Sequence, residues 1–214
     1  MTGALGFNPL QARADIVEIV FGERSPCMEA KLANPAPLGL MGFGMTTILL
    51  NLHNAGFWGV GSMILAMGLF YGGFAQIIAG IMEFKKGNTF GTTAFTSYGA
   101  FWLTLVFLLL APELGWWDKP ENGAMVAYLV MWGIFTMLLL VATFKLNRAV
   151  QVVFLSLTVL FFLLALKDAT GSELIGKIAG IEGIFCGASA MYLAMAEVLN
   201  EYYDRVVLPI GPMR

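Results

Sequence analysis

Residues 149–166 read AVQVVFLSLTVLFFLLAL, a stretch of mainly apolar residues without one charged side chain. A helix needs about 20 mainly apolar residues to cross the hydrocarbon core of a bilayer, so this stretch and its flanks are long enough to span a membrane. It lacks the alternation of apolar and polar residues that a strand of a transmembrane β-barrel would show. The stretch therefore predicts a membrane-spanning α-helix.

Charge-free stretches of this kind recur along the 214-residue chain. The composition agrees, because 12% of the residues are charged, against about 25% in ordinary globular proteins. The first stretch, 32–82, is interrupted near its middle by polar residues and a glycine, which divides it into two helices joined by a tight hairpin. The predicted fold is an all-α polytopic membrane protein with six transmembrane helices, at about 35–52, 58–82, 89–111, 123–144, 149–166 and 175–198.

The distribution of Lys and Arg predicts the orientation of the chain. Nine of these 12 residues fall in the two termini and in the loops after the second and fourth predicted helices. Cationic loops stay on the cytoplasmic side, so both termini are expected in the cytoplasm. We divide the chain into an N-terminal tail, 1–32, a transmembrane domain, 33–200, and a C-terminal tail, 201–214. The net charge of -2 and the lack of a basic tract give no case for nucleic-acid binding.

A pattern recurs three times along the chain. Three asparagines each follow a lysine closely and open a predicted helix, namely Asn34, Asn88 and Asn147. Asparagine is a favourable N-cap. Nine or ten residues further on stand three bulky apolar residues, Phe43, Tyr98 and Leu157. That distance is roughly 15 Å, about half the hydrocarbon thickness. The pattern predicts three helical hairpins around an axis, with these side chains at the midplane. Ordinary core packing is the alternative.

Hydroxyl and amide side chains supply a candidate polar path. A carboxylate at the midplane carries a desolvation cost of several kcal/mol, and the predicted helices contain no Lys or Arg near the midplane to offset it, since Lys177 stands at the outer end of the sixth. Amides, hydroxyls and the positive ends of helix dipoles remain. The alternative is that Ser and Thr bond to their own helix or to a neighbour. The candidate path residues are Thr46, Thr47, Asn51, Gln76, Ser97 and Gln151.

Two acids and several glycines on the predicted helices have expected roles. Glu182, near the outer end of the sixth helix, is expected at the membrane interface. Glu197, near the cytoplasmic end, is a candidate proton site, and a position reaching the interface is the alternative. Glycines spaced by four residues predict close helix approach, and they are Gly68, Gly72, Gly176, Gly180, Gly183 and Gly187.

Three segments carry a family resemblance. Residues 33–56 read ANPAPLGLMGFGMTTILLNLHNAG and contain a single NPA triplet, whereas an aquaporin needs two. Residues 70–102 read FYGGFAQIIAGIMEFKKGNTFGTTAFTSYGAFW, and residues 187–211 read GASAMYLAMAEVLNEYYDRVVLPIG. Together these segments resemble the acetate uptake transporter family, particularly the bacterial succinate-acetate permeases. The signature motif comprises Asn34, Pro35, Ala36, Pro37, Leu38, Gly39 and Leu40.

The resemblance implies six transmembrane helices, a homo-hexamer with a pore in each protomer, and transport of acetate and related small monocarboxylates, with succinate in some members. The family's hydrophobic constriction of a Phe, a Tyr and a Leu corresponds to Phe43, Tyr98 and Leu157. Ala190 matches a family position linked to substrate size. No cofactor or metal is implied.

These observations lead to one functional hypothesis with two alternatives. The chain is expected to conduct acetate and related monocarboxylates across the cytoplasmic (inner) membrane, as a channel-like anion conduit with a hydrophobic gate. The alternatives are an electroneutral proton-coupled acetate or succinate symporter, and a channel for neutral solutes or ammonium. An enzyme is not expected, because one His and two distant Cys cannot supply the usual catalytic or metal-binding sets.

Overall fold

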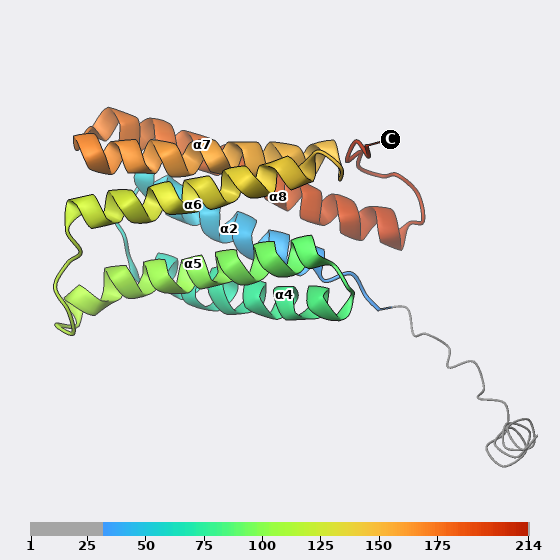
Figure 1. The fold of residues 1–214 in the computed structure, drawn as a ribbon, viewed down its shortest axis with the longest axis horizontal. Helices are drawn as coiled ribbons and strands as arrows, with labels where there is room; N and C mark the ends of the chain where they lie inside the picture. Colours follow the sequence, from blue (N-terminus) through green and yellow to red (C-terminus); the bar gives the residue numbers. More distant parts are fainter. Residues whose placement is uncertain (1–31, 214) are drawn as a thin grey trace, which may run out of the picture. The chain divides into compact units, whose positions relative to one another are not determined.

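The computed structural model describes residues 32–213, which from Asn34 onward form one compact unit. The predicted N-terminal tail lies outside the described residues apart from Leu32. Within the described part every element of regular secondary structure longer than a single bridge is a helix. Figure 1 shows their long axes running in roughly the same direction.

The described residues contain six long helices, one of them a composite. They are α2 (Ala36–Asn54), the continuous helix of α3 (Ser62–Ala66), η1 (Met67–Ala75) and α4 (Gln76–Lys85), α5 (Thr89–Glu113), α6 (Asn122–Thr143), α7 (Arg148–Thr170) and α8 (Glu173–Tyr202). Their positions confirm the six predicted helices to within a few residues. Five are long and apolar enough to cross a membrane by length and composition. The remaining helix, α2, has 19 residues and packs against α8, η1, α4 and α5.

The predicted asparagine caps are confirmed at two of the three helix starts. The Asn88 side chain accepts a hydrogen bond from the Gly91 amide at 3.1 Å, and Asn147 accepts one from the Val150 amide at 2.9 Å. Asn34 differs, because it stands two residues before α2 and its side chain accepts from the Ala36 amide at 3.3 Å. We call the end of the bundle where these three asparagines lie the asparagine end.

Glycines bring α2 and α8 into backbone contact. A Cβ atom on Gly44 would lie 2.7 Å from the Gly187 carbonyl oxygen, and one on Gly187 would lie 2.6 Å from the Gly44 carbonyl oxygen. A Cβ atom on Gly183 would overlap the side chain of Asn51. The predicted glycine face of the last helix is therefore a packing face, and its partner is α2.

The other helices complete the bundle around α2. Helix α7 packs between α6 and α8, and α5 packs on α4 and η1. Helices α5 and α6, although consecutive, have little backbone contact, and aromatic side chains bridge them, with Phe101 stacked on Tyr128 at a centroid distance of 5.8 Å. Figure 1 shows α6 and α7 side by side.

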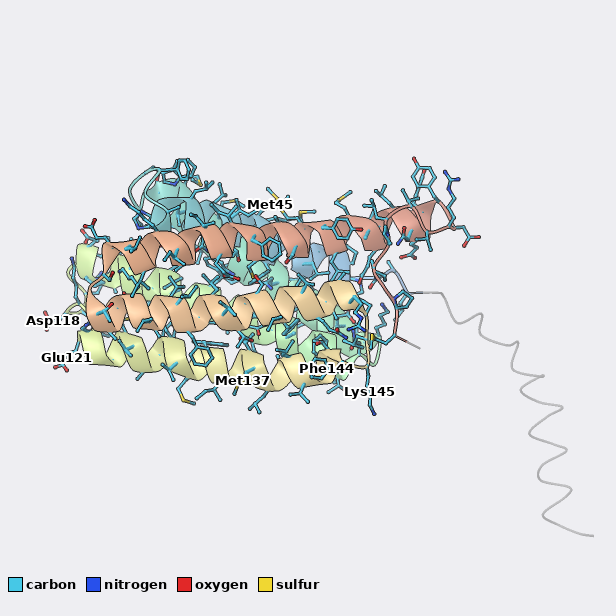
Figure 2. All side chains as sticks on the ribbon, turned by 90° about the horizontal axis from the view of Figure 1, so that it is seen from above. Met45, Asp118, Glu121, Met137, Phe144 and Lys145 are labelled. Atoms are coloured by element: carbon cyan, nitrogen blue, oxygen red, sulfur yellow. The ribbon has the colours of Figure 1, made fainter. Side chains whose placement is uncertain are left out.

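The flanks of the bundle are apolar and its ends carry charges. On α6 the side chains of Met137, Leu138 and Val141 are exposed. Figure 2 shows Met137 pointing away from the bundle, Asp118 and Glu121 at one end and Lys145 at the other. A bilayer requires this arrangement, because it solvates apolar side chains along the flank and leaves the charges at the two ends in water.

After α8 the chain turns back along the bundle. The amides of Val207 and Leu208 donate to the Asn200 side chain at 2.6 and 3.0 Å. The carbonyls of Ile210 and Gly211 then accept from the first two amides of α7, at 3.0 and 2.8 Å. We call residues 207–213 the C-terminal strap. It satisfies backbone donors of α7 that have no partner within their own helix.

We expect Gly187→Ala to destabilise the protein, because the new methyl group would meet a backbone carbonyl rather than a mobile side chain. Overpacking of this kind costs about 1–3 kcal/mol. Thermal unfolding of the purified protein in detergent measures the effect. Gly123→Ala is the matched control, because a Cβ atom there meets nothing within 4 Å. Equal unfolding temperatures for the two variants would contradict the backbone contact.

Candidate functional site: two cavities and an apolar constriction

A cavity of about 180 Å³ lies near the asparagine end. Most of its lining comes from apolar residues of α2, α5 and α7, the three helices predicted to surround a path. Its polar lining residues are Gln76, Asn88, Asn147 and Glu197. No Lys or Arg side chain of the described residues lines it. We call this space the near cavity.

The three residues predicted to form a constriction meet at this cavity. Phe43, Tyr98 and Leu157 all line it, and they are 6%, 4% and 3% exposed. The rings of Phe43 and Tyr98 have centroids 6.0 Å apart. The Tyr98 hydroxyl donates to Thr136 on α6 at 2.9 Å, so the polar atom of the ring is satisfied by the protein. The faces of these side chains therefore form an apolar wall.

A second cavity, of about 400 Å³, lies at the opposite end and is lined by His53, Lys167 and Lys177 among others. We call it the far cavity. Phe101 and Leu129 also line it. Trp132 lines neither of them, but the centroid of its ring lies 6.2 Å from that of Tyr98 and 5.2 Å from that of Phe101. Packed aromatic rings thus connect the wall of the near cavity with that of the far cavity.

The sequence analysis did not single out Phe101 or Trp132 as site residues. Phe101 stands three residues after Tyr98, so it follows on the same helix face, and that spacing was a usable signal. Trp132 had no such signal, because its role depends on α6 lying beside Tyr98.

The candidate path residues do not gather in one place. Gln76 alone lines the near cavity; it is buried, and its Oε1 atom has no hydrogen-bond partner in the described part of the chain. Thr46 is buried and donates to the Met67 carbonyl at 3.4 Å. Asn51 donates to the Thr47 carbonyl at 2.9 Å. Thr46, Thr47 and Asn51 therefore lie inside the packed bundle.

The remaining two path residues lie elsewhere, as does Ala190, the position that the family resemblance links to substrate size. Ser97 lines a shallow cavity beside α6. The Gln151 amide donates to the Thr143 carbonyl at 3.2 Å. Ala190 is fully buried and lies on neither cavity.

The signature motif reaches the near cavity through two of its residues. Ala36 and Leu40 are part of the lining. Asn34 makes a polar bridge: its amide donates to the Glu197 carboxylate at 2.8 Å, while its side-chain oxygen accepts from the Lys86 ammonium at 2.8 Å. The motif therefore joins the start of α2, the loop before α5 and the end of α8.

Glu83 is a buried acid that the sequence analysis did not single out. It is fully buried near the end of α4, and Asn88 donates to its Oε2 atom at 2.7 Å. Its Oε1 atom has no partner among the described residues. The predicted helix ended at residue 82, which hid this acid from the interpretation.

The starts of α5 and α7 offer a substrate fewer free backbone N–H donors than the sequence analysis expected. At α7 the amides of Arg148 and Ala149 bond to the C-terminal strap, and that of Val150 bonds to Asn147. At α5 the amide of Gly91 bonds to Asn88. Backbone donors of α7 are therefore already occupied, although the dipole itself remains.

The expectation that Glu182 lies at the interface is wrong. The Ser156 hydroxyl donates to its carboxylate, and Ser156 is a buried residue well inside α7. The Oε2 atom of Glu182 is buried without a partner among the described residues. Counting from the helix end misplaced this acid, because α8 begins at Glu173 and residue 182 lies roughly 14 Å along it.

A helical bundle with apolar flanks, two cavities and aromatic rings packed between its helices is the arrangement expected of a membrane channel or transporter. A family model described as the GPR1/FUN34/yaaH family matches residues 20–214, and the chain belongs to that family. This is the family of acetate uptake transporters.

Several relatives of the chain are named as transporters or channels. The chain is 62% identical to the succinate-acetate/proton symporter SatP of Escherichia coli strain K12, over 85% of this chain and 96% of that protein. A solved structure of the bacterial acetate channel SatP matches with a TM-score of 0.83, at 62% identity, covering 85% of this chain and all of that one. A yeast relative, the ammonia transport outward protein 2 of Saccharomyces cerevisiae, is 36% identical over 92% of this chain and 73% of its own length. These relatives support the expectation that the chain is not an enzyme.

We expect Thr136→Val to destabilise the protein by about 1–3 kcal/mol, because it leaves the buried Tyr98 hydroxyl without its acceptor. Tyr98→Phe should cost less. The double variant should recover part of the loss, since no unpaired hydroxyl then remains. Thermal unfolding in detergent measures all three variants. Strictly additive losses would show that the two hydroxyls do not interact.

Proposed function

We propose that the protein conducts acetate and related small monocarboxylates across the cytoplasmic membrane through the Phe43, Tyr98 and Leu157 constriction, as a channel-like anion conduit. Succinate is a further candidate substrate. The observation that carries the proposal is that these three side chains, from three different helices, all line the near cavity. The relationship to SatP at 62% identity supports the substrate class.

The lining of the near cavity fits weak binding of a small, partly apolar anion. No cation lines the cavity in the described part of the chain, so a tight ion pair with substrate has no partner there. Weak binding favours passage over occupancy. The apolar ring excludes hydrated inorganic ions, because they cannot exchange their water for its side chains. The methyl group of acetate can contact the same ring favourably.

One polar atom is placed to meet a substrate in the near cavity. The Gln76 side chain lines the cavity and is 1% exposed. A buried amide without a partner costs free energy. A substrate atom, or water travelling with it, would satisfy that amide. We therefore assign Gln76 to the substrate path, with Asn88 and Asn147 nearer the asparagine end.

Electroneutral proton symport is the second candidate, and one observation favours it. The Glu197 carboxylate lines the near cavity and accepts a hydrogen bond from Asn34. An acid placed on the path could carry a proton with the substrate. The E. coli relative is named as a succinate-acetate/proton symporter. A neutral-solute or ammonium channel is a third candidate, because the yeast relative is named as an ammonia transport protein.

The assembly and orientation belong to the same proposal. We infer a homo-hexamer with one pore in each protomer, and the exposed apolar flanks of the bundle are available for contact with lipid or with neighbouring protomers. We infer that both termini lie in the cytoplasm, because the termini and the loops after the second and fourth predicted helices hold nine of the 12 Lys and Arg residues. The asparagine end then faces the cytoplasm.

We expect the reversal potential of the purified protein in a planar bilayer to follow the acetate equilibrium potential under an acetate gradient. Tyr98→Ala should relax the preference for acetate over butyrate by roughly 10-fold, because it removes one side of the constriction. Trp116→Ala is the control, since this exposed side chain lies far along the chain from the constriction. A current carried equally by chloride would sink the anion-selective proposal, and an acetate current would count against the neutral-solute channel.

We expect Glu197→Gln to retain the acetate current, because glutamine still offers an oxygen to the Asn34 amide. Labelled acetate uptake into proteoliposomes with an imposed pH gradient tests the symport alternative on the same protein. Glu113→Gln, an exposed acid-to-amide change, is the control. A silent wild-type protein in the bilayer, together with loss of gradient-driven uptake in Glu197→Gln alone, would establish symport instead.

A further inference from the structure

The continuous helix formed by α3, η1 and α4 changes from α-helical to π-helical winding in its central part. Met67–Ala75 forms a π-helix of nine residues, flanked by α-helix on both sides. A π-helix is closed by hydrogen bonds from residue i to i+5 and usually occurs as a single turn, frequently at functional sites. A stretch of this length is therefore unusual, and the hydrophobic pattern of the sequence does not require it.

Carbonyl oxygens of this π-helix touch the neighbours of two constriction residues. A Cβ atom on Gly42 would lie 2.6 Å from the Tyr71 carbonyl oxygen, and Gly42 immediately precedes Phe43. A Cβ atom on Gly99 would lie 2.8 Å from the Gly73 carbonyl oxygen, and Gly99 immediately follows Tyr98. The same segment thus abuts the backbone of α2 and of α5, one residue away from each aromatic ring.

Two further contacts connect the π-helix to the site. Thr46 on α2 donates its hydroxyl to the carbonyl of Met67, the first residue of the segment, at 3.4 Å. Gln76 follows directly after the last residue of the segment and lines the near cavity with an unpartnered oxygen. The winding of the segment therefore also decides the direction in which Gln76 points, because each added residue in a turn rotates the side chains that follow.

We infer that the π-helix Met67–Ala75 is the positioning element of the constriction, which sets the separation of Phe43 and Tyr98 through Gly42 and Gly99. This inference rests on the proposed function. Packed backbones do not deform smoothly, so a change of winding in the segment must displace α2, α5 or both. Since the two contacts are made by carbonyls only two residues apart, one local change reaches both rings.

Deletion of Phe70 is the direct test. A helix closed by i to i+5 bonds holds more residues per turn than an α-helix, so removing one residue lets the segment close as an α-helix while its flanks keep their direction. Phe70 is 64% exposed, so its side chain contributes little to the core. Phe70→Ala is the matched control, because it removes the same side chain and keeps the chain length.

The measured quantity is the ratio of labelled acetate to labelled butyrate uptake into proteoliposomes. A structural weakening lowers both fluxes together and leaves their ratio unchanged. We expect deletion of Phe70 to change the ratio by about threefold or more, and Phe70→Ala to keep the wild-type ratio. An unchanged ratio in the deletion variant, with wild-type flux intact, overturns the inference and leaves the proposed function standing. A wild-type protein that takes up neither acid overturns the proposed function and the inference with it.

A second variant decides the matter if the deletion variant does not fold. Gly42→Ala places a methyl group 2.6 Å from the Tyr71 carbonyl oxygen, and its other neighbours lie 3.5 Å away, so it should change the ratio in the same experiment. Gly133→Ala is its control, because a Cβ atom there would meet only the ring of Phe162, at 3.1 Å, away from the π-helix. A shifted ratio in Gly42→Ala alone supports the inference, and equal ratios in the two variants overturn it.

Discussion

The backbone contact between α2 and α8 is the interaction on which the rest of the structure depends. Gly44 and Gly187 lie opposite each other without side chains between them, and in a bilayer such contact supplies packing that the hydrophobic effect does not. With one face of α2 held against α8, the side chains of Leu40 and Phe43 are left to line the near cavity. The position of the constriction follows from a contact that contains none of its residues.

The parts of the structure that could be predicted from sequence are those encoded locally. Apolar stretches gave the six helices to within a few residues, because a membrane span is defined by its own length and composition. The caps at Asn88 and Asn147 were predictable because a cap involves only the first turn of its helix. Depth counted from those caps placed Tyr98 and Leu157 at one level, and the structure brings both to the near cavity.

The parts that could not be predicted depend on which helices become neighbours. Asn34 was expected to cap α2, but its amide reaches Glu197, a residue far along the chain. The depth of Glu182 was misjudged because it is set by the packing of α8 on α7 rather than by its distance from a helix end. The π-helix gave no periodic signal, since its winding is stabilised by close contacts with α2 and α5. Local patterns carry no information about such partners.

The C-terminal strap also has a consequence for biosynthesis. The first two amides of α7 donate to the carbonyl oxygens of Ile210 and Gly211, and the ribosome makes those residues only after the whole of α8. Helix α7 must therefore enter the membrane with its start incomplete, and its first hydrogen bonds close only after α8 has been made. A domain fused directly after the strap would act on this late step of assembly.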